Sequence, residues 1–531
     1  MPENNPVDPE RQQAVESLAA AYSLEEPPIS GEGPKIKVPH AVATLASLYE
    51  KVRQAMEYNE PHLFRRASTE RILSRRLRAE SNSKLVAEGL LKELIRGRYL
   101  KNDFYPESIT TEIARILEKY RQLLQAREIS TANGDFSLVV RWASSEIEEF
   151  FAPPARQDAL ANLMLINLKK TVILSDPQLD ERYSLVQLQL AIYRNLLKLD
   201  RAMLDFNIFE MFYPDWKTNG EAHLGEVIGN FPQIKLATEK LSKYHLSGAL
   251  SALVRRFSSP FVLLRDALER AGAKILSDKA LLASEISNSY AHKIVRERER
   301  LATTTTRALI YIFLTKVVLS FVFELPAERL IYGGVRTLPF VINFLFPPLL
   351  LFLLTLSLNL PGRENEERII AAAKEAVSSP NGQRGIFSEK SRVEIKKRGG
   401  GLALTLFLIY FLAFFAIFGA LGWGLHQLGF TLFGIALFLF YTSIVTYFGL
   451  RVRESSRDLV IIGTKETVLE VLFDFFALPF LRAGSIISAG LSRFNVLVLI
   501  ITLLVEAPFQ TILEVLEEWI SFAREKKEEV Y

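Results

Sequence analysis

Between residues 35 and 307, apolar side chains recur at the three- and four-residue spacing of α-helices, and hardly any segment alternates like a strand. Two stretches show the pattern well: Ile109, Ile113, Ile116, Leu117, Tyr120 and Leu124, and Leu185, Leu188, Ile192, Leu196 and Leu199. Residues at this spacing share one face of a helix, and an apolar face is stable only when it is buried. We therefore expect this part of the chain to fold as a multi-helix bundle.

The helices of the bundle should end where proline or Asn-Gly interrupts the pattern, because proline removes a backbone donor and Asn-Gly favours turns. Such breaks fall at Pro106, Asn133-Gly134, Pro153-Pro154, Pro177, Pro214 to Gly220, Pro232 and Pro260. Any subdivision of the bundle is expected near residue 153. The helix from about Asp278 through Arg300 has no proline or glycine before the apolar region that follows, so we expect it to continue into that region.

After Arg307 the pattern changes to long apolar runs, four of which approach the roughly 20 residues that cross a bilayer as a helix. They are Ala308 to Phe323, Leu338 to Leu360, Leu402 to Trp423 and Leu428 to Leu450. The first is short unless Thr303 to Thr306 extend it, and Pro347 and Pro348 are expected to kink the second. The sequence thus predicts two transmembrane hairpins, residues 308–360 and 401–450.

Basic residues flank these runs on alternate sides, and Lys and Arg are retained on the cytoplasmic side of a membrane. The three basic flanks are Arg296, Arg298, Arg300 and Arg307 before the first run; Arg363, Arg368, Lys374, Arg384, Lys390, Arg392, Lys396, Lys397 and Arg398 in the loop of residues 361–400; and Arg451, Arg453 and Arg457 after the fourth run. The other two loops hold only Arg329 and Arg336. All three basic flanks fall on one side, which predicts that the helical bundle and the C-terminus are both cytoplasmic.

The two ends of the chain lack such long apolar runs. Residues 1–34 are rich in Pro, Glu and Asn and lack the pattern of a signal peptide, so we expect a disordered acidic tail. In residues 451–531 the apolar stretches are interrupted by Glu470, Asp474, Arg482, Arg493 and Glu506. We expect amphipathic helices associated with the cytoplasmic membrane face. The alternative is a fifth span from about Ile486 to Val505, which would put the C-terminus outside.

The amino-acid composition limits the kinds of catalytic and metal-binding site that the chain can form. The chain has no cysteine, which excludes disulfides, a catalytic thiol and thiolate metal sites. Its six histidines show no metal-ligand spacing, and HExxH, GxxxxGK[ST], GxGxxG and GxSxG do not occur. We therefore predict no catalytic, cofactor or metal site and lean against an enzyme. The net charge of +4 is too small to argue for nucleic acid by itself.

Lys316 lies inside the first predicted span, where a charge costs at least about 2.5 kcal/mol and therefore needs a partner. Candidate partners are Glu324 two helical turns on, Asn343 in the second span, and Asp474 or Glu506 in the tail. Such a group could relay ions or protons, or contact a lipid headgroup. The alternative, which we favour, is a structural ion pair or a side chain that reaches the interface.

Five glycines lie in the third and fourth predicted spans or in the turn between them: Gly419, Gly422, Gly424, Gly429 and Gly434. Because glycine has no side chain, it lets helix backbones approach closely. We expect these residues to pack the two spans together and prefer that role to a substrate path.

The densest charge cluster before the membrane region consists of six arginines with one acidic residue, Glu70, among them. The arginines are Arg65, Arg66, Arg71, Arg75, Arg76 and Arg78. They could contact anionic lipid or RNA, or form a solvated face paired with acidic neighbours elsewhere in the bundle. No aromatic residues are interleaved for base stacking, so nucleic acid is not an expected partner.

Four stretches carry a likeness to known sequences: Ile312 to Lys316, Leu338 to Leu349, Glu506 to Phe509 and Glu517 to Lys527. In these stretches the chain resembles a family of uncharacterised bacterial multi-pass membrane proteins, and the likeness covers the membrane half best. The resemblance implies a bacterial plasma membrane and no particular activity.

These observations favour an all-α protein with a cytoplasmic helical bundle, a four-span membrane region and C-terminal amphipathic helices. More than half of the chain precedes the membrane region. Our first hypothesis is therefore a membrane-anchored, non-enzymatic scaffold or adaptor. As partners we expect the lipid bilayer and either another protein, which would favour this hypothesis, or a homo-oligomer, which would favour the channel or transporter below. The alternatives are an oligomeric channel or transporter with Lys316 in its path, and a membrane-bound enzyme acting on lipid or envelope precursors.

Overall fold

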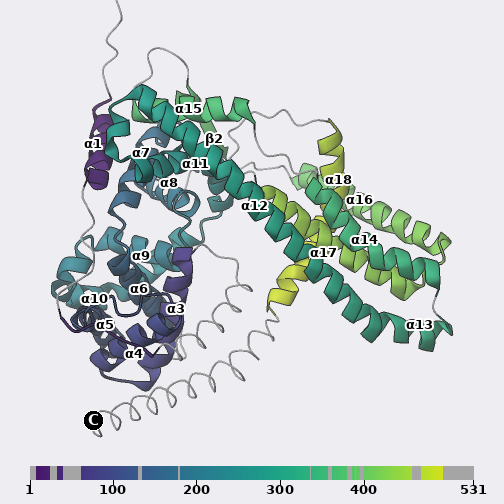
Figure 1. Ribbon diagram of the computed structural model, residues 1–531, viewed down its shortest axis with the longest axis horizontal. Coiled ribbons are helices and arrows are strands. Elements are labelled where there is room, and N and C mark those ends of the chain that lie inside the picture. Colours follow the sequence, from purple (N-terminus) through teal and green to yellow (C-terminus); the bar gives the residue numbers. More distant parts are fainter. Residues whose placement is uncertain are drawn as a thin grey trace, which may run out of the picture.

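The computed structural model describes residues 8–23, 33–39, 61–129, 134–176, 180–334, 336–356, 362–378, 385–388, 390–394, 400–456 and 468–493. Over these residues 82% of the chain is helical, with 17 α-helices and two strands of four residues each. The all-α prediction is confirmed. The molecule has two parts: a helical domain and a bundle of longer apolar helices, joined by the long helix α12 (Figure 1).

The helical domain contains two hydrophobic cores. Its helices are α1 (Pro9–Ser23), α3 (Pro61–Ala79), α4 (Ser83–Arg96), α5 (Ile109–Ala126), α6 (Gly134–Phe151), α7 (Ala155–Leu168), α8 (Glu181–Asn195), α9 (Arg201–Phe212), α10 (Trp216–Ser242) and α11 (Ser247–Ala271). One core is formed by α3 to α6 with parts of α9 and α10, and the other by α1, α7, α8 and α11 with later segments. The expectation of a disordered tail is therefore wrong for α1, because Ala14 and Leu18 are buried in the second core. The first core contains residues before position 153 and also residues from Phe206 to Ile234. A single boundary near residue 153 therefore does not separate the two cores in the sequence.

Local sequence explains where several helices begin. The side chains of Asn82, Asp180 and Asp200 accept hydrogen bonds from backbone N–H groups in the first turns of α4, α8 and α9. The predicted apolar stripe of α5 is buried from Ile109 to Tyr120, as expected for a helix that faces a core. In the second predicted stripe the first residue, Leu185, is exposed and the other four are buried.

Two predicted helix breaks are wrong. Pro232 lies inside α10 and Pro260 lies inside α11. A proline inside a helix costs about 3 kcal/mol, but Phe257 and Phe261 on either side of Pro260 are buried in the core. Burial of two such side chains offsets a cost of this size, so packing overrides the local preference.

Helix α12 (Lys279–Leu319) leads from the helical domain into the apolar bundle without interruption, as predicted. Asp278 caps its first turn by accepting hydrogen bonds from two backbone N–H groups. A π-helical turn, η2 (Ser320–Glu324), follows, and then the short helix α13 (Leu325–Tyr332) at the far end of the bundle (Figure 1). Gly333, with a φ of 73°, ends α13 in a left-handed conformation that favours glycine.

Three described helices are long and apolar enough to cross a membrane, one fewer than predicted. The three are α14 (Thr337–Leu356), α16 (Gly400–Gln427) and α17 (Leu432–Ser456). The predicted first span, residues 308–323, is not among them. That stretch is divided between the end of α12 and η2 and contains Lys316. Pro347 and Pro348 both lie within α14, which continues past them to Leu356.

Helix α17 is the centre of the apolar bundle, and small residues allow close packing on two sides of it. A Cβ atom added to Gly484 of α18 (Val468–Arg493) would lie 2.2 Å from the carbonyl oxygen of Ser443 in α17. On another side, Gly449 accommodates Leu354 of α14. Because Ser443 lies near the middle of α17, α18 contacts the middle of α17 and not only its end.

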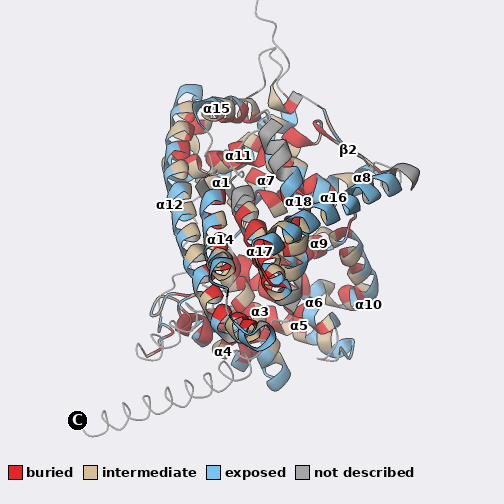
Figure 2. Ribbon diagram, turned by 90° about the vertical axis from the view of Figure 1, so that its right-hand side faces the viewer, coloured by how far each residue is buried: buried red, intermediate tan, exposed pale blue. Residues whose placement is uncertain are grey.

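The five glycines that were predicted to pack α16 against α17 differ in their surroundings. No atom lies within 4 Å of a Cβ built on Gly419 or Gly424, so these two do not mark a close contact. A Cβ on Gly422 would lie 3.8 Å from Ile435 of α17, which is an ordinary contact, and the neighbours of Gly429 and Gly434 lie outside α16. Helix α16 is correspondingly exposed over most of its length (Figure 2). The predicted fifth span reaches beyond Arg493 and so lies largely outside the described residues.

The segment predicted as a basic loop, residues 361–400, contributes structure to the helical domain. Helix α15 (Arg363–Val377) places Ile369, Ala372, Ala373 and Ala376 in the second core. Strand β2 (Ser391–Glu394) pairs in parallel with β1 (Val172–Ser175), which follows α7. This segment follows the helix α14, so it joins the apolar bundle to the helical domain a second time.

Candidate functional site

The polar group with the clearest functional potential lies in the apolar bundle, around η2. The Nζ atom of Lys316 lies 3.1 Å from Oε2 of Glu324, and the hydroxyl of Ser320 donates to the same oxygen at 2.8 Å. All three residues are at most 3% exposed. The wide π-helical turn lies between the lysine and the glutamate, and such turns often occur at functional sites.

Two further helices complete this polar cluster of the apolar bundle. From α14, Nδ2 of Asn343 donates to Oε1 of Glu324 at 2.5 Å. From α17, the ring of Tyr441 lies under the Lys316 ammonium, with Nζ 4.5 Å from the ring centroid, a cation–π distance. Sequence analysis named Lys316, Glu324 and Asn343 as neighbours, and the structure brings the three together. The carboxylate thus faces one cation and two neutral donors in an apolar setting.

A second carboxylate extends the cluster toward the α13 end. Glu328 is buried and accepts a hydrogen bond from the hydroxyl of Thr431, in the turn before α17. Glu324 and Glu328 line one small cavity of about 10 Å³, close to the volume needed by a single water molecule. Arg336 lines the same cavity and donates to the Gly429 carbonyl at 2.7 Å. The two acids therefore share a confined polar space.

Sequence analysis missed Glu328 and Thr431, although part of the signal was present. Lys316, Ser320, Glu324 and Glu328 recur at four-residue intervals, which places polar side chains along one helix face within an apolar stretch. Thr431 is 103 positions away in the sequence, and no local pattern links it to Glu328.

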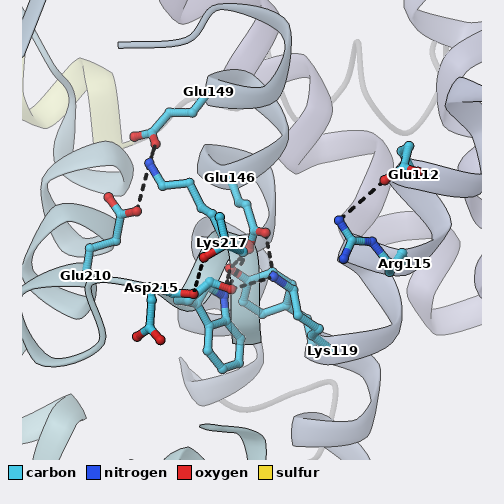
Figure 3. Close-up of polar contacts among 11 residues, drawn as sticks. Glu112, Arg115, Lys119, Glu146, Glu149, Glu210, Asp215 and Lys217 are labelled. Carbon is cyan, nitrogen blue, oxygen red and sulfur yellow. Dashed lines mark hydrogen bonds and ion pairs between the residues drawn. The ribbon is translucent and has the colours of Figure 1, made fainter. Parts of the chain in front are cut away.

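The helical domain contains a second buried charge network, shown in Figure 3. Lys119 lies 2.6 Å from Glu146, and the same carboxylate accepts hydrogen bonds from Tyr120 at 2.6 Å and from the indole of Trp216 at 3.0 Å. Burial, followed by the charge of Glu146, raises the pKa of Tyr120 well above its usual value, so the phenol remains a donor. The four side chains connect α5, α6 and α10, and both carboxylate oxygens of Glu146 have a partner.

Beside this network, Lys217 lies between two carboxylates (Figure 3). It pairs with Glu149 and lies 2.8 Å from Oε1 of Glu210. Burial, followed by the charge of Glu210, raises the pKa of Glu149 to about 7. Burial also raises the pKa of Glu210. Partial neutralisation near neutral pH makes this triad sensitive to pH.

The predicted arginine cluster is largely engaged within the chain. Arg65 forms a bidentate pair with Glu148 at 2.7 and 2.8 Å, and Arg75 and Arg76 both bind Glu93. Arg66 contacts Glu70 and also Asp200 at 2.6 Å, Arg78 lies over the ring of Phe136, and Arg71 also has a partner. These contacts favour a structural role, the alternative weighed above, over a free surface for anionic lipid.

Within the described ranges, no three His, Asp or Glu side chains come together in a way that could hold a metal ion. No protein-family model, curated protein or solved structure matches this chain.

Proposed function

We propose that this protein is a membrane-anchored, non-enzymatic helical scaffold or adaptor whose helical domain lies on the cytoplasmic face of a bacterial plasma membrane. The observation that carries the proposal is the double connection between the two parts of the molecule. Helix α12 continues from the second core into the apolar bundle, and α15 with β2 returns from α14 into the same core. A domain held at two points presents its outer surfaces in a fixed orientation.

Hydrogen bonds support the second attachment. Asn167 of α7 donates to the carbonyl of Ala376 at 3.2 Å, and the Thr171 hydroxyl donates to the carbonyl of Phe387 at 2.5 Å. Ser287 of α12 donates to Glu366 of α15 at 2.5 Å. The returning segment is thus bound to both the domain and the connecting helix.

The topology that we propose has four crossings, with the end of α12 as the first. The chain has to reach α13 at the far end of the bundle before α14 can return, and the end of α12 provides that path (Figure 1). Ile312 of α12 packs with Leu351 of α14 and Val445 of α17 in one apolar cluster. Together with the basic flanks, this arrangement supports cytoplasmic placement of the helical domain and of the end of α17.

Affinity purification of the full-length protein from native membranes in mild detergent tests the scaffold proposal. We expect a stoichiometric protein partner that is retained by the double variant Lys316→Leu/Glu324→Leu, because a scaffold does not use the intramembrane charges. Recovery of a homo-oligomer with no other protein would contradict the proposal.

A second candidate is an ion or proton transporter, favoured by the confined space that Glu324 and Glu328 share. A carboxylate next to a lysine and a water-sized cavity is an arrangement able to exchange a proton within a membrane. In liposomes, Lys316→Ala and Glu324→Gln should then abolish flux, whereas Arg329→Ala, an exposed position in α13, should preserve it. Equal flux in the parent and all three variants would reject this candidate.

A further inference from the structure

A basic groove in the helical domain lies apart from all the sites described above. It consists of two adjoining cavities of about 320 and 290 Å³ between α1, α7, α11 and the first half of α12. Among the described residues that line it are two carboxylates, Asp266 and Glu269, and five basic side chains: Arg156, Arg265, Arg270, Lys293 and Arg296. The excess of basic groups favours an anion.

The basic side chains of the groove are not equally available. Arg265 pairs with Asp266 at 3.0 Å, Arg270 lies 3.9 Å from Glu285, and Arg156 lies over the ring of Tyr22. By contrast, neither Lys293 nor Arg296 forms an ion pair with any residue in the described part of the chain. These two side chains lie one turn apart on α12, so both can reach a single ligand.

A buried hydroxyl gives an independent sign of a ligand. Ser289 lines the same groove, one turn before Lys293, and is 2% exposed. Its Oγ atom has no hydrogen-bond partner among the described residues, and an unsatisfied buried polar group costs about 1–3 kcal/mol. A ligand oxygen in the groove would satisfy this hydroxyl.

We propose that this groove binds a phosphate group, with Ser289 donating a hydrogen bond and Lys293 and Arg296 supplying charge. A phosphate offers several acceptor oxygens and a negative charge, which matches one hydroxyl and two cations on one helix face. Cavities of this size also suit a small organic molecule that carries the phosphate.

The position of the groove along α12 favours a soluble carrier over a membrane lipid. Twelve residues separate Arg296 from Ala308, where the apolar stretch begins, which corresponds to about 18 Å at the rise of an α-helix. A lipid headgroup at the membrane surface would have to leave the bilayer by that distance. The proposal does not depend on the scaffold function.

Calorimetric titration of inorganic pyrophosphate into the full-length protein in zwitterionic nanodiscs tests this site. We expect saturable binding that weakens at least tenfold in Lys293→Gln and in Arg296→Gln and that weakens in Ser289→Ala. Arg298→Gln is the matched control, since Arg298 is exposed on the same helix and does not line the groove.

A second arm distinguishes the sources of the phosphate group. Nanodiscs that contain phosphatidic acid should leave pyrophosphate binding unchanged if the carrier is soluble. Competition by phosphatidic acid, with the same dependence on Lys293, would assign the site to a lipid headgroup and overturn the soluble carrier. Absence of pyrophosphate binding, or equal binding in all variants including Arg298→Gln, would overturn the site itself.

Discussion

At the scale of single residues, this molecule compensates its buried charges with partners from other helices. Glu324 faces Lys316, Ser320 and Asn343, and Glu146 faces Lys119. Removing one member of such a pair leaves an uncompensated charge, whereas removing both replaces the pair by apolar contact. The difference between these two outcomes is measurable.

Lys316→Leu should lower the free energy of unfolding by about 3 kcal/mol or more, because Glu324 would remain buried without its cation. The double variant Lys316→Leu/Glu324→Leu should recover most of that loss. Thermal unfolding in detergent measures both, with Arg329→Leu as an exposed control. If the double variant is as unstable as Lys316→Leu, the loss of stability does not come from an uncompensated charge on Glu324, and the prediction is contradicted.

The triad at Lys217 should make stability depend on pH. Burial, then Glu210, raises the pKa of Glu149 from 4.5 to about 7, so the folded state binds this proton more tightly than the unfolded state. The resulting stabilisation is present below pH 4.5 and is lost as the pH rises toward 7.

Accordingly, the melting temperature of the full-length protein should fall between pH 5 and pH 7, and Glu149→Gln should make that fall shallower. Glu112→Gln, at a half-exposed ion pair with Arg115, should leave the slope unchanged. Parallel pH profiles for the parent and Glu149→Gln would contradict the assignment.

The sequence allowed the intramembrane residues to be grouped because Lys316 and Glu324 are two helical turns apart within one apolar stretch. It could not predict the network around Glu146, whose partners Lys119 and Trp216 come from helices distant in sequence. Only the tertiary packing of α5, α6 and α10 brings these residues together.

At the scale of secondary-structure elements, α15 is the segment whose role differs most from expectation. Its basic and acidic residues indicated a loop, yet Ile369, Ala372, Ala373 and Ala376 follow helical spacing and face the second core. Small alanines give a weak apolar signal, and the parallel pairing of β1 with β2 joins residues more than two hundred positions apart. Neither feature is visible in a local pattern.

Ile369→Asp should detach α15 from the helical domain, because Ile369 is fully buried and a carboxylate there would lack a partner. We expect a loss of roughly 3 kcal/mol or more in stability. Limited proteolysis should cut between residues 361 and 400 faster in this variant than in the parent. Arg363→Asp, exposed on the first turn of α15, is the control; equal cleavage in both variants would contradict the attachment.

The contact between α17 and α18 gives a prediction for the apolar bundle. Gly484→Leu should lower the melting temperature in detergent, because its side chain would overlap backbone atoms of Ser443. Gly419→Leu adds the same atoms where no neighbour lies within 4 Å and should have little effect. Equal effects of the two substitutions would show that α18 does not pack at Gly484.

At the scale of the whole molecule, the sequence predicted an all-α protein with an apolar C-terminal half, and both features are present. These follow from strong periodic and compositional signals. The number of independent apolar helices was overestimated by one, because the first stretch is the end of the long helix α12. The two cores of the helical domain could not be predicted, since α1 and α15 join the second core from distant parts of the sequence.

In the topology that we propose, α12 carries the chain across the membrane, so that the helical domain and α15 lie on one side and α13 on the other. The absence of cysteine allows a direct test, because each introduced thiol is the only one in the chain. The variants are Leu236→Cys in α10, Glu364→Cys in α15 and Leu330→Cys in α13, all at exposed positions, with the buried Val445→Cys as the control.

The measurement is labelling by a membrane-impermeant maleimide in intact cells and in inverted vesicles. We predict that Leu330→Cys is labelled only in intact cells, that Leu236→Cys and Glu364→Cys are labelled only in inverted vesicles, and that Val445→Cys is labelled in neither. Labelling of Leu330→Cys from the same side as Leu236→Cys would contradict the account, because α12 would then not cross the membrane.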